Sequence, residues 1–300
     1  MTELSLRATG RARRRLLANR VAEGGALLAA VAALAVLGIL VWSVFSRGLD
    51  AFSLDFFTKG PAAFGQTGGG IAPAIAGSAL LIAIATAMAL PIGILTAIYV
   101  SEFAPRAIAR NVRLWLDVLS GFPSIVIGIF VFALMVKTKI PLFDVGHHQS
   151  ALAGGFALAV IMLPLVARST MEVLALVPSH LREASYALGV SKWQTVLRVI
   201  LPTAFGGILT GTTLAVARAA GETAPLLFAC FLAGQTVDWN PTHSVSSIPI
   251  VIFTYSEAPD PQSHAQAWAA AFVLIAFVLV TSLTARILLD RSRRKLGVGR

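Results

Sequence analysis

Two arginine–glutamate pairs lie inside otherwise apolar stretches, where ionisable side chains are uncommon. Arg218 and Glu222 are four residues apart, and Arg168 and Glu172 repeat this spacing. Residues four apart share one face of an α-helix, so each glutamate is expected to neutralise its arginine. A guanidinium offers a tetrahedral oxyanion two parallel hydrogen bonds. We therefore expect these pairs to exchange their internal bonds for bonds to a passing anion; the alternative is that they only hold helices together.

The composition places these pairs in a membrane. Hydrophobic residues make up 57% of the 300 residues, charged residues 13%, and the mean hydropathy is +0.81. A soluble protein has about 25% charged residues, which it needs to cover its surface. The single cysteine, Cys230, also excludes a scaffold held by disulfides within the chain. The sequence predicts an all-α integral membrane protein.

Six apolar stretches are long enough to cross a bilayer as helices, since about 20 residues suffice. They cover residues 24–46, 71–100, 114–136, 151–175, 203–235 and 265–289. The first is longer than the apolar core of a signal peptide, so we expect an uncleaved anchor helix. Arg218 falls near the middle of the fifth stretch, where a charge costs about 2.5–3.5 kcal/mol and usually serves a transport pathway. Gly221 and Pro225 are the expected places for this stretch to bend or break.

The basic residues predict the orientation. Of the 24 lysines and arginines, 19 lie in the two tails and in two loops on the same side, and only four lie in the opposite loops. Because cytoplasmic loops carry the excess of basic residues, both termini are expected in the cytoplasm. The net charge of +10 then needs no nucleic-acid partner, and membrane lipid is the expected surrounding.

These features divide the chain into segments. A loop at 236–262 contains a short apolar run, 247–253, which either dips into the membrane interface or forms a docking surface. The expected segments are a basic cytoplasmic tail (1–22), an anchor helix (23–46), a periplasmic loop (47–70), a transmembrane domain (71–290) and a cytoplasmic tail (291–300).

A cytoplasmic loop at 178–202 has the pattern of two helices joined by a turn. Pro178 suits a helix start, and Gly189 suits a left-handed turn at the end of a helix over 179–188. Ser191 and Gln194 have the spacing of a capping box that begins a second helix. We expect a rigid protrusion that docks to a soluble partner; the alternative is an ordinary solvated loop.

Two further segments contain residues that could form a site. Pro123 lies between Ser120 and Ser124, which predicts a kink whose freed backbone groups are satisfied by the two hydroxyls, with gating as a second role. His147 and His148 are adjacent in an external loop, but they lack the ligand spacing of a metal site.

The 178–202 loop resembles the EAA loop of bacterial ABC importer permeases. Its matching residues are Glu183-Ala184-Ser185, then Gly189, then Ile200-Leu201-Pro202, with Ser185 in place of the usual alanine. Other blocks look like the PstA-type permeases of phosphate importers, over roughly residues 70–290. They are 91–94 with Tyr99, Glu102 and Phe103, then 121–126, 168–172 and 218–227. The last block, Arg-Ala-Ala-Gly-Glu-Thr-Ala-Pro-Leu-Leu, is the specific one; an EAA loop alone indicates only the superfamily.

This resemblance implies a type I ABC importer fold (MetI-like) in a bacterial inner membrane. It implies that pathway and gating residues include Arg218, Glu222, Arg168, Glu172, Thr223, Pro123 and Ser124. ATPase coupling would fall to Glu183, Ala184, Ser185, Gly189 and Pro202. The implied partners are a second permease (PstC-like), a dimer of ATP-binding subunits (PstB-like), a periplasmic phosphate-binding protein (PstS-like) and inorganic phosphate.

No cofactor is expected on this chain itself. The phosphate-binding loop pattern GxxxxGK[ST] is absent, because no Gly-Lys dipeptide occurs. ATP and Mg²⁺ would therefore be bound by the partner subunits. The nearer rival is a permease for another solute, such as sulfate, a polyamine or an amino acid. An intramembrane enzyme or a cation channel is disfavoured, since the ionisable residues at depth are arginines and carboxylates in balance.

Overall fold

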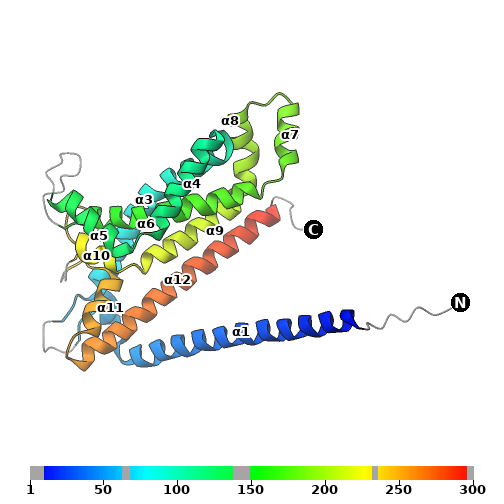
Figure 1. Cartoon of the computed structure of the whole chain (residues 1–300). Coiled ribbons are helices and arrows are strands. Elements are labelled where there is room, and N and C mark those ends of the chain that lie inside the picture. Colours follow the sequence, from blue (N-terminus) through cyan, green and yellow to red (C-terminus); the bar gives the residue numbers. More distant parts are fainter. Residues whose placement is uncertain (1–9, 63–67, 138–148, 232–235, 296–300) are drawn as a thin grey trace.

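The computed structural model describes residues 10–62, 68–137, 149–231 and 236–295, and every regular element in them is helical. The long helices are α1 (Arg11–Gly48), α3 (Ala72–Ile98), α6 (Ala151–Ala175), α9 (Leu201–Ala220) and α12 (Pro261–Lys295). The shorter ones are α2 (Leu54–Thr58), α4 (Arg106–Gly121), α5 (Ser124–Val131), α7 (Ser179–Ala187), α8 (Lys192–Thr195), α10 (Ala224–Ala229) and α11 (Ile248–Ser256). Figure 1 shows α3, α6, α9 and α12 running side by side, with α1 diverging from them.

Five helical segments are long and apolar enough to cross a membrane, and a sixth span results if the bent pair α4–α5 counts as one. The prediction of an all-α fold with six spans is confirmed in this sense. The third span is not the straight helix expected over 114–136, because α4 and α5 meet at an angle of 96°. Phe122 is extended (φ −67°, ψ 134°) between them. A proline disfavours the helical conformation in the residue before it, which explains the break at Pro123.

The core lies between α3 and α6. Leu81, Leu158, Met162 and Val166 are almost completely buried there. Close approach of the two helices depends on small residues: a Cβ added to Gly154 would lie 2.7 Å from the Leu81 side chain. Glycines at helix interfaces allow this separation in membranes, where packing and not the hydrophobic effect joins helices.

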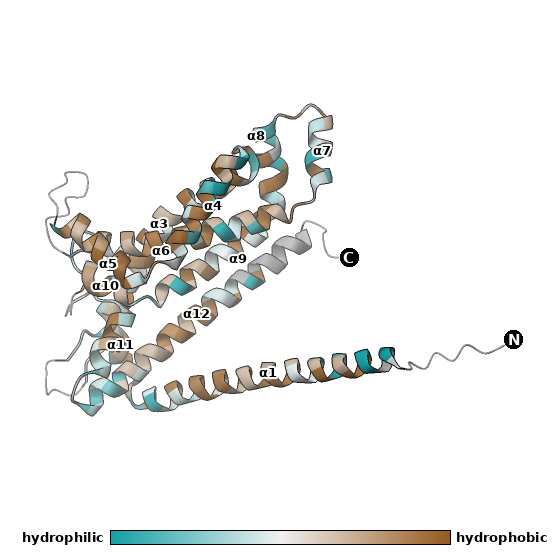
Figure 2. Cartoon of the chain, in the orientation of Figure 1, coloured by the Kyte–Doolittle hydropathy of each residue, from teal (hydrophilic) through white to brown (hydrophobic). Residues whose placement is uncertain are grey.

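Among the described residues, helix α1 packs against the other helices near its C-terminal end. There Phe45 packs against Phe272 (ring centroids 5.1 Å apart), and the Arg47 guanidinium lies 4.9 Å from the Trp268 ring centroid. Only 6% of its most apolar window is buried. Figure 2 shows this helix hydrophobic through its middle and hydrophilic at its N-terminal end, as expected for a helix surrounded by lipid.

The apolar run 247–253 forms helix α11 inside the fold. Ser247 caps the helix through a hydrogen bond from the Ile250 N–H (3.4 Å), and the Ile248 N–H donates to Ser78 Oγ on α3 (2.8 Å). Ile248, Pro249, Ile250 and Val251 are buried, against α12 and the start of α3. Four apolar side chains of this run therefore help to form the core at this end of the bundle, and its predicted roles, interface dipping or docking, stay predictions.

The segments that carry most of the basic residues lie at one end of the helix bundle. In Figure 1 the N-terminal end of α1, the α7–α8 turn and the C-terminal end of α12 lie towards one end of the bundle. Helices α5, α10 and α11 lie towards the other end. The segments that carry most of the lysines and arginines thus share one end, which is the arrangement that the charge count predicted.

Candidate functional site

The central cavity, as we name it, lies where the α4–α5 break meets α6 and the end of α9. Its volume is about 230 Å³, far more than the roughly 10–15 Å³ that one water molecule requires. The residues that line it are Leu119, Ser120, Phe122, Ser124, Ile161, Pro164, Leu165, Arg168, Arg218, Glu222 and Ile127. Four of the sequence-predicted pathway residues (Ser124, Arg168, Arg218 and Glu222) are thereby brought together from three different segments.

Close packing of α6 on α9 sets the depth of Arg218. A Cβ added to Gly207 would lie 2.5 Å from the Val173 side chain, and one added to Gly211 would lie 2.5 Å from Ser169 Oγ. The two helices run in opposite directions, so this register places Arg218 level with the middle of α6. Sequence counting had also placed Arg218 near mid-depth.

Arg218 and Glu222 do not form the helical pair that their spacing suggested. Helix α9 ends at Ala220, and the Gly221 and Glu222 N–H groups donate to the carbonyls of Arg218 and Ala219 (both 3.1 Å) in a terminal turn. Arg218 is exposed and Glu222 is half-buried, and no ion pair joins them among the described residues. The predicted break near Gly221 is confirmed, and this break is what removes the i, i+4 geometry.

Arg168 has a different partner from the one predicted. Its Nη2 donates to Asp117 Oδ1 on α4, whereas Glu172, on the same helix α6, is exposed at the surface. Both members of the Arg168–Asp117 pair are partly exposed, 40% and 58% respectively. Arg168 Nε is buried and has no hydrogen-bond partner in the described part of the chain. A long-range contact between α4 and α6 thus replaces the local pair that sequence spacing favoured.

The remaining predicted pathway residues surround the breaks. Thr223 precedes α10, and Pro123 precedes α5. The Ser120 hydroxyl donates to the Leu116 carbonyl (2.9 Å) in the last turn of α4, and the Leu119 carbonyl, four residues before Pro123, accepts from the Phe122 N–H (3.3 Å). The prediction that the serine hydroxyls satisfy the backbone groups freed by Pro123 is therefore not confirmed. Ser120 and Ser124 both line the cavity. The two breaks meet where Gly128 of α5 faces Pro225 of α10: a Cβ added to Gly128 would lie 2.6 Å from Pro225 Cα.

These positions define what the central cavity can bind. Two guanidiniums, serine hydroxyls and one half-buried carboxylate face a space otherwise lined by apolar side chains. Guanidinium donors recognise carboxylate, sulfate or phosphate oxygens. Arg168 is already paired with Asp117, whereas Arg218 has no ion pair among the described residues. The cavity is therefore suited to a small oxyanion and not to a cation.

The 178–202 loop forms a helix–turn–helix, as predicted. Helix α7 ends in a turn in which Gly189 has φ +75°, a left-handed conformation that favours glycine. Nothing lies within 4 Å of a Cβ added there, so the backbone conformation alone selects glycine. The Ser191 N–H donates to Gln194 Oε1 (3.4 Å) in the predicted capping box. A continuous helical segment then runs from Lys192 to Ala220, with a π-helical turn over Val196–Ile200.

The predicted coupling residues divide into an outer and an inner set. Glu183, Ala184 and Gly189 are exposed, as is Pro202 in the first turn of α9. Ser185 is buried, and its hydroxyl bonds with Thr195 Oγ1 across the two limbs of the loop (2.8 Å). The serine that departs from the EAA pattern thus makes a hydrogen bond that an alanine lacks.

Sequence reasoning missed the ion pair that anchors this loop. Arg182 donates to Glu102 Oε1 (2.9 Å), and also to the carbonyls of Val177 (2.6 Å) and Leu174 (3.0 Å). Glu102 lies in a π-helical turn, Tyr99–Phe103, that extends α3, and its side chain is only 7% exposed. Glu102 belongs to a block that resembles the family, and Arg182 lies in the 178–202 loop. Because 80 residues separate them, no local sequence pattern links the two.

No group of three or more potential metal ligands occurs among the residues that the structure describes. His147 and His148 lie outside those residues.

Comparisons with known proteins agree with this architecture. The family described as "Binding-protein-dependent transport system inner membrane component" matches residues 89–295. The chain belongs to this family. Its curated relatives include the phosphate transport system permease protein PstA of Yersinia pestis, 39% identical, with 85% of each chain covered. They also include PstA of Haemophilus influenzae (36% identical; 92% of this chain and 95% of the relative) and PstA 1 of Mycobacterium tuberculosis strain H37Rv (37%; 94% and 91%).

A solved structure shows the same fold. An inward-facing form of the MetNI methionine ABC transporter aligns with a TM-score of 0.57 at 18% identity, over 74% of this chain and 94% of that chain. This chain is thus a membrane subunit with a MetI-like fold.

Proposed function

We propose that the chain is the membrane-spanning permease subunit of an ATP-driven phosphate importer. The observation that carries this proposal is the central cavity, in which Arg168 and Arg218 face the same space from α6 and α9. Relatives named as phosphate transport permeases match over most of the chain. The oxyanion chemistry of the cavity and the names of the relatives therefore support one substrate class.

Transport in this proposal proceeds by exchange of partners at the cavity. An incoming phosphate displaces the Asp117 carboxylate from Arg168 and accepts hydrogen bonds from Arg218. The Glu222 carboxylate repels the phosphate, which prevents it from remaining bound in the cavity. Such an exchange gives both guanidiniums an anionic partner while phosphate is bound, and Arg168 returns to Asp117 when phosphate leaves. Thr223, Pro123 and Ser124 flank the helix breaks where this movement would occur. Glu172, exposed on α6, has no role in this scheme.

Energy comes from partner subunits in this proposal. We place the docking surface for an ATP-binding subunit on the exposed residues of α7 and the turn after it. ATP and Mg²⁺ bind to that dimer of subunits, and this chain carries no cofactor. A second permease completes the pathway, and a periplasmic phosphate-binding protein delivers the solute.

We also place both termini in the cytoplasm of a bacterial cell, in its inner membrane. This orientation is supported by the basic segments that share one end of the bundle. Reporter fusions after residues 60, 145 and 245 should report the periplasm, and fusions after 108, 190 and 298 the cytoplasm. Reversal of any two would contradict the orientation.

Transport in a defined system tests the function. The chain is reconstituted with its proposed second permease, ATPase and binding protein into vesicles loaded with ATP. Uptake of labelled phosphate is measured against competing sulfate. We expect ATP-dependent uptake that excess phosphate competes and sulfate does not. ATP-dependent uptake of sulfate, a polyamine or an amino acid in place of phosphate would favour the rival permease.

A further inference from the structure

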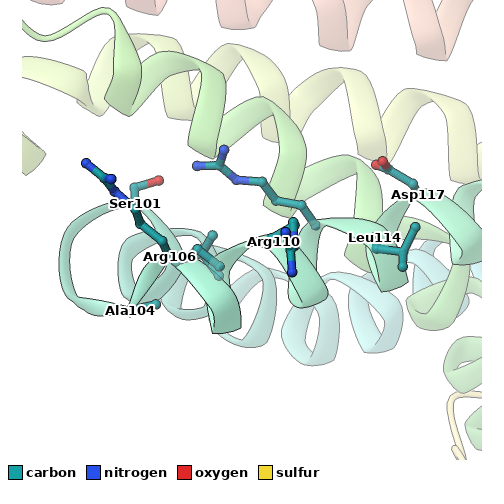
Figure 3. Close-up of a pocket in the computed structure, with 9 residues that line it drawn as sticks. Ser101, Ala104, Arg106, Arg110, Leu114 and Asp117 are labelled. Atoms are coloured by element: carbon teal, nitrogen blue, oxygen red, sulfur yellow. The ribbon is translucent and has the colours of Figure 1, made fainter.

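A second cleft, lined by arginines, lies along α4 at the end of the molecule that carries the 178–202 loop. We name it the arginine cleft; its volume is about 520 Å³. Its polar lining consists of Ser101, Arg106, Arg110, Arg113 and Asp117. Figure 3 shows Arg106 beside Ser101 at one end of the cleft and Asp117 farther along the same helix. The spacing of the three arginines and Asp117 keeps them along one side of α4.

The arginines of this cleft have no carboxylate partner among the described residues. Two acidic residues close to this segment in the sequence already have partners: Asp117 binds Arg168, and Glu102 binds Arg182. The side chains of Arg106, Arg110 and Arg113 are exposed and form no ion pair or hydrogen bond in the described part of the chain. Three unneutralised guanidiniums along one wall give a strongly positive cleft that attracts anions.

The arginine cleft also lies next to the central cavity. Asp117 lines the first and its partner Arg168 lines the second, so the ion pair between them forms the boundary. Both spaces therefore border the same ion pair. This shared boundary distinguishes the cleft from basic residues that merely flank a membrane span.

We propose that the arginine cleft is a binding site for a phosphate group, held by Arg106, Arg110 and Arg113 at the cytoplasmic end of α4. This inference rests on the proposed function for its orientation and deepens it with a second anion site. The phosphate group has two possible sources, inorganic phosphate leaving the central cavity and the headgroup of an anionic lipid. Both present the oxygens that guanidinium forks bind in pairs.

The test uses the complete transporter complex, without binding protein, in nanodiscs. One arm measures binding of labelled inorganic phosphate in discs of neutral phosphatidylcholine. The other measures retention of phosphatidylglycerol by native mass spectrometry. The variant is Arg110→Gln with Arg113→Gln, and the matched control is Arg15→Gln with Arg20→Gln, two exposed arginines on α1 outside the cleft. Arg106→Gln is a second, single variant in case the double variant does not assemble.

We expect the cleft variants to weaken one of the two binding signals about tenfold or more, as loss of charge-assisted hydrogen bonds predicts. The control should change neither. Loss in the phosphate arm identifies inorganic phosphate as the ligand, and loss in the lipid arm identifies a headgroup. Equal binding by cleft and control variants in both arms would overturn the proposal. Failure of the proposed function shows separately, as absence of phosphate uptake in the vesicle assay with cleft binding intact.

Discussion

Arg182 and Arg218 show how differently this fold uses the same side chain. The Arg182 guanidinium binds a buried carboxylate and two backbone carbonyls, and 22% of its side chain is exposed. Arg218 lines a cavity, is exposed to it, and has no ion pair in the described structure. A guanidinium whose donors are satisfied holds its surroundings together, whereas one whose donors are unused is available to a ligand. The difference shows that what separates a structural arginine from a binding arginine is whether its donors already make hydrogen bonds within the protein.

The largest expected effect comes from breaking the ion pair between Arg182 and Glu102. Arg182→Gln leaves Glu102 buried and unpaired, so we expect a loss of stability on the order of 3 kcal/mol and a severe loss of protein from the membrane. Glu102→Gln should cost less, because Arg182 keeps two carbonyl acceptors. Abundance by immunoblot and thermal unfolding in detergent measure both. Arg198→Gln, an exposed arginine on the neighbouring π-helical turn, is the control, and equal abundance of Arg182→Gln and this control would contradict the structural role.

The next largest effect is expected at Arg218, where we expect transport to be lost while stability is kept. We expect the double variant Arg218→Gln with Glu222→Gln to reach normal abundance, because no described ion pair is broken, while phosphate uptake is lost. The physical reason is that a dehydrating phosphate needs charged donors at that depth. Uptake in vesicles and abundance are measured together. Substantial uptake by a well-expressed double variant would show that Arg218 is only structural.

A third prediction concerns the turn of the 178–202 loop. Gly189→Val places a β-branched residue in a left-handed conformation, which costs about 1–2 kcal/mol for L-residues, so we expect ATPase activity that no longer responds to transport. Gly189→Asn is the matched control, since asparagine tolerates this conformation and there is open space at the position. Glu183→Lys, which reverses an exposed charge on α7, should uncouple without loss of abundance. If Gly189→Val couples as well as Gly189→Asn, backbone shape at the turn is irrelevant to docking.

The smallest effect on stability is expected at the exposed ion pair. Asp117→Asn removes the partner of Arg168, but both side chains are well exposed, and such pairs contribute about 0–1 kcal/mol. We expect thermal unfolding in detergent to change little compared with the wild type. A loss of stability as large as that of Arg182→Gln would show that the two ion pairs contribute alike. Arg168 would then be a structural arginine in the same sense as Arg182.

Much of the site was predictable because its signals are local. The turn at Gly189, the Ser191–Gln194 capping box and the break near Gly221 each depend on residues within a few positions of one another. Among the charged residues of the site, the predictions that failed were the ion pairings. The i, i+4 rule favoured Glu172 for Arg168 and Glu222 for Arg218, but it holds only where a helix continues and no other element competes.

By itself the sequence determined that this protein is a helical membrane protein with its basic segments on one side, because apolar length and charge placement act on each segment separately. It also determined where helices stop, since proline and glycine impose local backbone limits. Only the tertiary structure decided which charges meet. Asp117 lies 51 residues from Arg168, and Glu102 lies 80 residues from Arg182. Such partners are chosen by the packing of α4 and α3 on α6 and the 178–202 loop, and one-dimensional spacing carries no record of that packing.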